Sequence, residues 1–331
     1  MRNPHDASHQ TSSDGFILIA VLWILAALAT LASIFSIYLA NTAVFLALND
    51  NTIQSEALVF ASLELTAYEV SAPKPAANSP APAPPPRGDA NFPPPPTHGN
   101  FNFRLGRANV AVNFISEAAR IDLNFASSQL VANLLAALGA QRQEAEQYAD
   151  QIAGWTTRPR AQSTFVAAQD NEEALYRAAG RNYSPRGAPF AHIDELSLVI
   201  DLPPALIERA KPFLTVYSGK PQIDVLDAAP EVLAAIPGMT PNLLSALAEA
   251  RRTAADPQSI SEALNALQGV ATVEGGDTYR VQVRIRYDNG RQDTSEVVIV
   301  TGLTDKPYRV LYWRDGVNVS SDLAQPPLRP R

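Results

Sequence analysis

The longest uncharged stretch of the sequence lies close to the amino terminus and limits the possible folds more than any other feature. Residues 16–49 carry no charged side chain, and the first 25 of them, Phe16–Ala40, are almost entirely apolar. A helix of that length measures about 37 Å, at about 1.5 Å per residue, whereas the hydrocarbon core of a bilayer is about 30 Å thick. We therefore expect residues 16–40 to form one transmembrane helix.

The helical pattern continues beyond Ala40 in an amphipathic form. Apolar side chains recur every seven residues, at Leu46, Ile53, Phe60 and Ala67. Acidic side chains are interspersed, at Asp50, Glu56, Glu64 and Glu69. This pattern predicts that residues 41–71 extend the same helix. We expect the face that carries Ile53, Ala57 and Phe60 to pack against a partner helix or against the chain's own sheet.

Residues 72–98 are expected to form an extended and exposed linker. Eleven of the residues in 72–96 are proline. Proline lacks a backbone donor and disfavours the interior of both helices and sheets, and proline-rich segments act as semi-rigid spacers. The linker therefore separates the long helix from the remainder of the chain.

Strand-like alternation occurs on both sides of a long middle region. It is found before this region at residues 101–105 and 109–115, and after it at residues 278–287, 295–300 and 308–313. Asp288-Asn289-Gly290 is a hairpin turn signal. We expect segments 99–125 and 274–316 to form one antiparallel sheet, followed by a tail at residues 317–331. Residues 126–273 then form a mostly helical domain inserted between strands, and the predicted fold class is α+β.

The middle region contains an internal repeat. The sequence IDLNFASSQLVANLLAAL begins at Ile121 and IDVLDAAPEVLAAI begins at Ile223, so that both copies join an Ile-Asp pair to a leucine-rich helix. The second copy resembles a helix-hairpin-helix module, whose DNA-binding versions present backbone N–H groups to a phosphate. Here the hairpin reads Gly238-Met239-Thr240, with threonine in place of a second glycine. We expect this motif to serve packing.

Charge and composition argue against several classes of function. The formal net charge is −7, and an acidic chain gains little from DNA phosphates, so we expect no nucleic-acid partner. The absence of cysteine excludes disulfides, thiol catalysis and cysteine metal sites. The sequence contains no phosphate loop, metal-ligand spacing or nucleophile motif. We therefore expect a structural protein and not an enzyme.

The amino-terminal residues resemble the precursors of type IV pilins. A short polar leader, residues 1–15, ends at Gly15 and is followed by Phe16 and the long apolar helix. The resemblance implies that a prepilin peptidase cuts between Gly15 and Phe16 on the cytoplasmic side, and that the new terminal amine of Phe16 is methylated. An uncleaved single-span anchor is the alternative.

The fifth residue after the implied cleavage point is Ala20, where most pilins have a glutamate. A carboxylate near the middle of a bilayer costs about 2.5–3.5 kcal/mol, and pilins tolerate it because it pairs with the terminal amine of a neighbouring subunit. A subunit with nothing above it has no such amine to meet. The resemblance therefore implies that Ala20 suits a subunit at a filament tip.

Short motifs along nearly the whole chain resemble one family, the minor pseudopilin K of type II secretion (general secretion pathway protein K). These motifs are Gly15-Phe16, Ala20 with Leu22-Trp23, Ile121-Asp122-Leu123-Asn124, Pro189-Phe190, Asp194-Glu195-Leu196, Pro212-Phe213-Leu214-Thr215, Ile223-Asp224-Val225, Ala229-Pro230-Glu231-Val232-Leu233 and Tyr308-Arg309-Val310-Leu311-Tyr312-Trp313-Arg314. The resemblance implies a pilin-like long helix packed on an antiparallel sheet that carries a large helical insertion.

The same resemblance implies a role and a location. The protein is expected at the tip of a periplasmic pseudopilus, where it initiates assembly with the minor pseudopilins I and J and other pseudopilins, for protein export across the outer membrane. It would cross the bacterial inner membrane once, with a cytoplasmic amino terminus and its bulk in the periplasm. A type IV minor pilin or a membrane-anchored helix-hairpin-helix DNA receptor is the alternative.

Some members of this family bind calcium through an aspartate-rich stretch that follows a tryptophan. Here Trp155 is followed by Thr156-Thr157-Arg158, and the nearest acidic side chains are Asp170, Glu172 and Glu173. Calcium takes about 6–8 oxygen ligands. We expect no cofactor, and these three residues are the candidates if calcium is bound.

The implied processing gives a first prediction. The mature protein is expected to begin at a methylated Phe16, and Gly15→Leu is expected to block maturation because it alters the residue before the cut. Intact-mass measurement of protein extracted from membranes decides between the alternatives. A mass that matches the full chain, or a cut near Ala40, contradicts the pilin-type amino terminus.

Overall fold

The computed structural model describes two compact units of the chain, residues 1–57 and residues 58–331. The described residues are 14–71, 95–157, 173–253, 260, 264, 267 and 269–316, with the backbone alone given at 14–17, 40, 41 and 43–51. Three predicted segments therefore lie largely or wholly outside the described residues. They are the leader, the proline-rich linker and the carboxyl-terminal tail.

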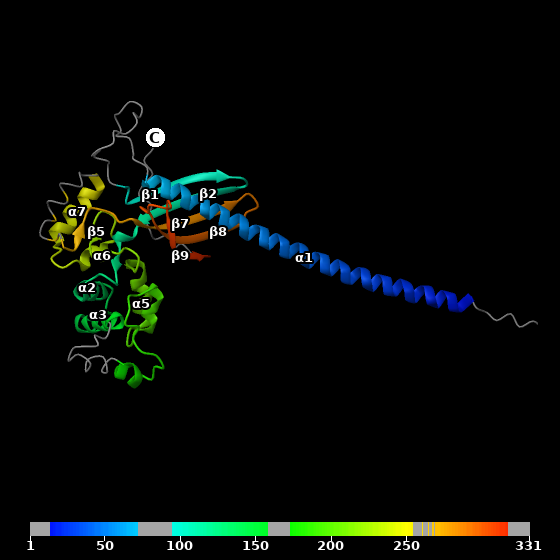
Figure 1. The fold of residues 1–331 in the computed structure, drawn as a ribbon, viewed down its shortest axis with the longest axis horizontal. Coiled ribbons are helices and arrows are strands. Elements are labelled where there is room, and N and C mark those ends of the chain that lie inside the picture. Colours follow the sequence, from blue (N-terminus) through cyan, green and yellow to red (C-terminus); the bar gives the residue numbers. More distant parts are fainter. Residues whose placement is uncertain are drawn as a thin grey trace, which may run out of the picture. The chain divides into compact units, whose positions relative to one another are not determined.

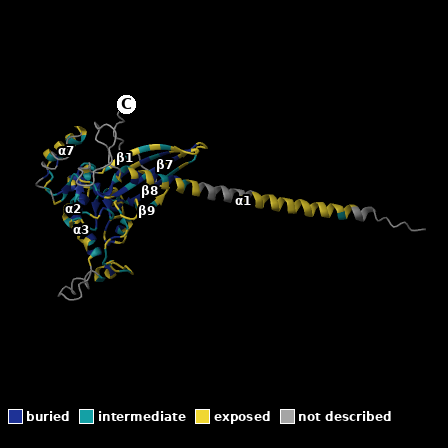
Figure 2. Cartoon of the chain, turned by 45° about the horizontal axis from the view of Figure 1, so that its top comes forward, coloured by how far each residue is buried: buried dark blue, intermediate teal, exposed yellow. Residues whose placement is uncertain are grey.

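The described part of the first unit is helix α1, which runs Asp14–Ser71 and so continues into the second unit. Its segment Leu18–Leu39 has a mean hydropathy of 2.6, and none of it is buried within the chain. Figure 2 shows this segment almost entirely in yellow, the colour of exposed residues. It is the one helix in the described part that is long and apolar enough to cross a membrane, and it coincides with the span predicted at residues 16–40.

The second unit contains a five-stranded antiparallel sheet with the strand order β1-β2-β7-β8-β9. The strands are β1 (His98–Leu105), β2 (Ala108–Ser116), β7 (Thr278–Tyr287), β8 (Gln292–Val300) and β9 (Arg309–Asp315). Figure 1 shows these strands side by side although their colours come from opposite ends of the sequence. Because β2 pairs with β7, the chain leaves the sheet after Ser116 and returns at Thr278. The predicted α+β fold class is confirmed.

The second half of α1 covers one face of the sheet. Side chains alternate between the two faces of a strand, and the apolar set on β2, β7 and β8 is buried: Val110, Val112, Phe114, Val281, Val283, Ile285, Val297 and Ile299. These residues form one core cluster with Leu58, Val59, Leu63 and Val70 of α1. On the opposite face β7 presents polar side chains, including Arg280, Gln282 and Arg284. The alternation therefore decides which face of the sheet the helix can bury.

Residues 117–277 contain short helices and two small parallel ribbons. The helical elements are η1 (Glu117–Ala119), α2 (Ser128–Ala137), α3 (Arg142–Thr156), η2 (Ile193–Leu198), α5 (Pro204–Ala210), η3 (Lys211–Phe213), α6 (Pro230–Ala235) and α7 (Pro241–Thr253). Their apolar side chains make a second core cluster, separate from that of the sheet. Three of these elements, η1, η2 and η3, are 3₁₀ helices.

The boundary between sheet and insertion also differs from the predicted one at residue 126. The five-stranded sheet ends at Ser116, and Ile121 and Leu123 already belong to the core of the helical region. The predicted sheet segment 99–125 was too long because Ile121-Asp122 continues the apolar pattern of β2. These two residues form β3 (Ile121–Asp122), which pairs in parallel with β4 (Leu214–Thr215) and not with the sheet.

The internal repeat seen in the sequence is a structural repeat. The second copy forms β5 (Ile223–Asp224), which pairs in parallel with β6 (Ala271–Thr272), just as β3 pairs with β4. In both copies the aspartate accepts a hydrogen bond from the backbone N–H two residues later, at 2.9 Å from Asn124 N to Asp122 Oδ1 and 2.9 Å from Leu226 N to Asp224 Oδ1. This local turn directs the chain from the strand toward the following helix.

Candidate functional site

The predicted partner face of α1 remains exposed in the described part of the chain. Ile53 is 58% exposed and Phe60 is 48% exposed, and Ala57 is also exposed. Residues spaced by three and four positions share one face of a helix. Ala67 belongs to the same seven-residue series but is buried, so the series does not follow one buried face. The face at Ile53, Ala57 and Phe60 is available to another molecule.

Phe60 also packs against Trp313 of the edge strand β9. Its ring lies 5.2 Å from the ring of Trp313, measured between centroids, and the two planes are tilted by 56°. The indole Nε1–H of Trp313 donates a hydrogen bond to Asp315 Oδ1 at 2.8 Å, which holds the indole in place. Phe60 therefore packs on Trp313 within the chain and leaves about half of its surface exposed.

The junction of the sheet with the helical region is a buried ion-pair network. Glu117 follows β2 and is fully buried. Its carboxylate accepts hydrogen bonds from Arg280 of β7, at 2.7 Å from Nε to Oε1 and 3.1 Å from Nη2 to Oε2. Arg280 also donates from Nη1 to Glu296 Oε1 of β8, at 2.6 Å. The hydroxyl of Thr215, in β4, donates to the second oxygen of Glu117. One carboxylate thus joins the sheet to the β3-β4 ribbon.

The electrostatics of this junction favour its charged form. Burial raises the pKa of Glu117, but the guanidinium groups of Arg280 and Arg120 outweigh burial and hold the pKa below its ordinary value. A buried charge is tolerated only when it is paired and hydrogen-bonded, and Glu117 meets that condition. The network works as a structural joint. No local pattern in the sequence indicates this network, because Glu117 and Arg280 are far apart in the chain.

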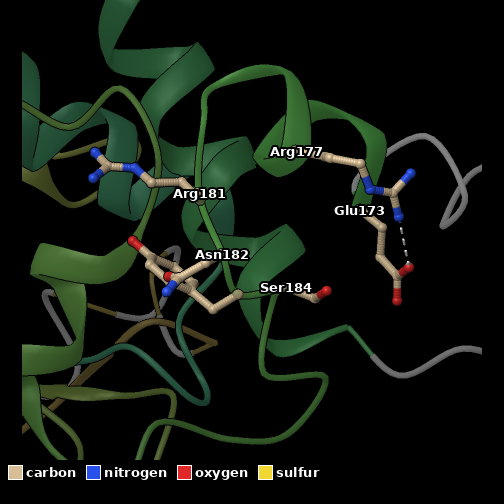
Figure 3. Close-up of a pocket in the computed structure, with 6 residues that line it drawn as sticks. Glu173, Arg177, Arg181, Asn182 and Ser184 are labelled. Carbon is tan, nitrogen blue, oxygen red and sulfur yellow. Dashed lines mark ion pairs between the residues drawn. The ribbon is translucent and has the colours of Figure 1, made fainter.

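The candidate calcium ligands are only partly described. Asp170 and Glu172 lie outside the described residues, whereas Glu173 lies beside a hollow of about 220 Å³ that is also lined by Arg177, Arg181, Asn182, Tyr183 and Ser184. Figure 3 shows the carboxylate of Glu173 directed toward Arg177, and the two groups are 3.7 Å apart. Within the described ranges no three His, Asp or Glu side chains are placed to hold a metal ion. Calcium binding by Asp170, Glu172 and Glu173 stays a prediction.

The helix-hairpin-helix-like turn uses its polar groups within the fold. Met239 N donates to Ile236 O at 3.1 Å, and the Thr240 hydroxyl accepts from Leu243 N at 3.2 Å, which caps α7. Gly238 has a φ of +85°, a conformation that favours glycine, and a side chain there would meet Leu267 at 3.0 Å. The turn thus packs on Leu267, and the threonine that replaces the second glycine serves as a helix cap.

The processing residues lie at the start of α1. The helix begins at Asp14, so the backbone of Gly15 and Phe16 is helical, while residues 1–13 of the leader lie outside the described residues. Ala20 lies one turn further along the same helix. Cleavage and methylation stay predictions.

Comparison with known proteins agrees with the resemblance found in the sequence. Residues 109–219 match the family described as Type II secretion system (T2SS), protein K. A search of curated protein sequences found no match. Among solved structures, the chain is similar to one described as the crystal structure of the GspK-GspI-GspJ complex from the enterotoxigenic Escherichia coli Type 2 Secretion System. Sequence identity is 18%, the TM-score is 0.55, and the match covers 81% of this chain and 98% of that chain.

The buried junction gives a second prediction. Glu117→Gln leaves the guanidinium of Arg280 without its main counter-charge, and breaking a buried pair costs about 3–5 kcal/mol. We expect the free energy of unfolding, measured by urea titration of the full chain in detergent micelles, to fall by that amount. Because the folded pKa of Glu117 lies below its ordinary value, the stabilisation is present at neutral pH and is lost as the pH falls through the folded pKa.

Two controls make this prediction specific. Arg104→Met breaks the exposed pair between Arg104 and Asp288, whose charged groups are 2.9 Å apart, and is expected to cost less than about 1 kcal/mol. The double variant Glu117→Leu/Arg280→Met removes both charges and is expected to recover part of the loss. Equal effects of Glu117→Gln and Arg104→Met would contradict the role assigned to the junction.

Proposed function

We propose that this chain, which carries a domain of the type II secretion system protein K family at residues 109–219, is the minor pseudopilin at the tip of a periplasmic pseudopilus. The observation that carries the proposal is the family match within a pilin-like fold, in which α1 covers one face of a sheet and the sheet is interrupted by a helical insertion. Its partners are the minor pseudopilins I and J and other pseudopilins. The GspK-GspI-GspJ complex of the similar structure supports this choice of partners.

The proposed location follows from α1. The apolar segment Leu18–Leu39 anchors the chain in the bacterial inner membrane, with the amino terminus in the cytoplasm and the sheet and helical region in the periplasm. A prepilin peptidase removes residues 1–15. The protein acts by shape and contact, without catalysis or a cofactor, as suits a structural component of a secretion system.

The partner interface is proposed on the exposed face of α1. Ile53, Ala57 and Phe60 share this face and carry no charge, and apolar side chains in this spacing pack well against a second helix. Phe60 has about half of its surface exposed beyond its contact with Trp313. Burying that remaining surface against a neighbouring helix contributes to assembly, since apolar burial is worth about 25 cal/mol per Å².

The third prediction tests this face. Phe60→Asp is expected to reduce co-purification with the minor pseudopilins I and J at least tenfold, because it places a charge in an apolar contact. Leu65→Asp is the matched control, since Leu65 is 40% exposed on the same helix but points to a different side, and we expect it to retain the partners. The intact fold of both variants is checked by circular dichroism. Retention of both partners by Phe60→Asp would remove the interface from this face.

Capping of the pseudopilus is proposed from the insertion and from Ala20. The helical region between β2 and β7 has its own hydrophobic core, so it is a bulky addition to a pilin-like head. A subunit in the middle of a filament must leave room for the next subunit, and bulk at this position obstructs stacking. Ala20 also offers no carboxylate to a preceding terminal amine. Both features are tolerable at a tip.

The fourth prediction follows from capping. Overproduction of the chain is expected to shorten or suppress fibres of the major subunit. Ser116 lies opposite Tyr279 in the sheet register, so a short Asn-Gly turn can replace the whole insertion between Ser116 and Thr278. This deletion is expected to relieve the suppression, whereas Ala20→Glu alone is expected to relieve it little because the bulk remains.

Immunogold labelling reads out the position of the subunit directly. Label at one end of each fibre, at a single copy, is the expected result. Label distributed along the fibre contradicts capping and favours the alternative of a type IV minor pilin.

A further inference from the structure

The aspartates of the two copies of the structural repeat differ in their hydrogen bonding. In the first copy every carboxylate oxygen of Asp122 is hydrogen-bonded. Oδ1 accepts from Asn124 N at 2.9 Å, and Oδ2 accepts from Gly219 N at 2.9 Å and from the Ser218 hydroxyl at 3.2 Å. A buried aspartate in this position is thus satisfied by the residues that follow the partner strand β4.

In the second copy the equivalent carboxylate lacks such a partner. Asp224 is fully buried, and its Oδ1 accepts from Leu226 N at 2.9 Å. Its Oδ2 is buried and has no hydrogen-bond partner among the described residues. The position of Gly219 is taken by Gly276, but Gly276 N donates to the Ser116 hydroxyl instead, at 2.9 Å. A buried carboxylate oxygen without a donor is costly when it is charged.

The carboxylate of Asp227, three residues after Asp224, also has a buried oxygen without a hydrogen-bond partner among the described residues. Asp227 has an 8% exposed side chain, and its Oδ1 is 2.6 Å from Nδ1 of His98 at the start of β1. Its Oδ2 is also buried without a hydrogen-bond partner among the described residues. His98 therefore links the first strand of the sheet to the second copy of the repeat.

The surrounding groups do not balance both negative charges fully. Arg251 of α7 is near both carboxylates, but its guanidinium hydrogen bonds go to carbonyl oxygens, with 2.9 Å from Nε to Val225 O and 2.8 Å from Nη2 to Ala228 O. The charges of Arg251 and His98 lower the pKa of Asp224, but burial and the charge of Asp227 outweigh them. Burial and the charges of Asp277 and Asp224 raise the pKa of Tyr279 of β7 to about 12, so its phenol is neutral. As noted above, the described residues offer no set of three side chains for a metal ion. A bound proton would remove the charge from a buried carboxylate oxygen that has no donor.

We propose that the Asp224–Asp227 pair is a proton-binding site that makes the attachment of the second repeat to the start of β1 sensitive to pH. When the pair holds a proton, the carboxyl group of Asp224 is neutral, and its O–H can donate a hydrogen bond. Asp227 keeps its contact with His98. When the proton leaves, two buried carboxylates repel each other across the turn that follows β5. The β5-β6 ribbon and the start of α6 then open more readily.

The titration of Asp224 supports this assignment. Burial, and next the charge of Asp227, raise the pKa of Asp224 to about 6. A carboxyl group whose folded pKa is raised stabilises the fold at low pH, and this contribution is lost as the pH rises through the folded pKa. With an ordinary pKa of 3.8 in the open state, the equilibrium constant for opening is expected to be about tenfold larger at pH 8 than at pH 5.

Hydrogen exchange of the full chain in detergent micelles tests the proposal. Peptides that cover Ile223 and the start of α6 are followed by mass spectrometry at pH 5 and pH 8, and rates are corrected for intrinsic exchange. The wild type is expected to show the tenfold difference in opening. Asp224→Asn keeps the oxygen that accepts from Leu226 N but carries no charge, so its difference is expected to fall below about twofold.

Control variants separate this site from its neighbours. Asp122→Asn alters the satisfied aspartate of the first copy and is expected to leave the pH dependence of the second copy unchanged. His98→Gln removes the imidazole that contacts Asp227, and a retained difference assigns the effect to the carboxylates. Equal opening of the wild type at both pH values, or an unchanged difference in Asp224→Asn, overturns the proposal. Loss of the protection on adding EDTA also overturns it, because a cation would then balance the pair.

Discussion

The pairing of β2 with β7 is the contact on which the rest of this structure depends. It joins two strands that are separated by residues 117–277 and completes a five-stranded sheet from both ends of the second unit. The pairing register also sets which side chains share a face, because side chains alternate along a strand. One face becomes continuous and apolar and is buried by α1. The other becomes polar and carries Arg280 into contact with Glu117.

The buried pair of Glu117 and Arg280 then connects the sheet to the inserted helices. Its carboxylate receives donors from β7 and from Thr215 of the β3-β4 ribbon. A network of this kind adds orientation more than net stability, because desolvation offsets much of the attraction between the charges. The hydrogen bonds of Glu117 thus orient the helical region at the point where it leaves the sheet. The stability of the helical region comes from its own apolar core.

These features together suit a subunit that acts through its surfaces. The anchor segment of α1 is exposed and apolar, the side chains of the partner face at Ile53, Ala57 and Phe60 are exposed, and the insertion adds bulk to the head. Part of the inserted helical region is built from two copies of one structural repeat. A two-residue strand, an aspartate turn and a leucine-rich helix occur twice, and the two copies differ in whether the aspartate is satisfied.

The elements that could be predicted from the amino-acid sequence are those with local patterns. The uncharged run at residues 16–49 set the long helix, the alternation at Thr278–Tyr287 set β7, and the repeated Ile-Asp pairs marked both ribbons. The sequence did not determine the contacts that join distant segments. Ile121-Asp122 looked like a continuation of β2 because a two-residue strand has no pattern of its own. The roles of Glu117 and Asp224, and the contact of Phe60 with Trp313, appear only in the tertiary structure. Burial and the position of a partner depend on residues far away in the chain.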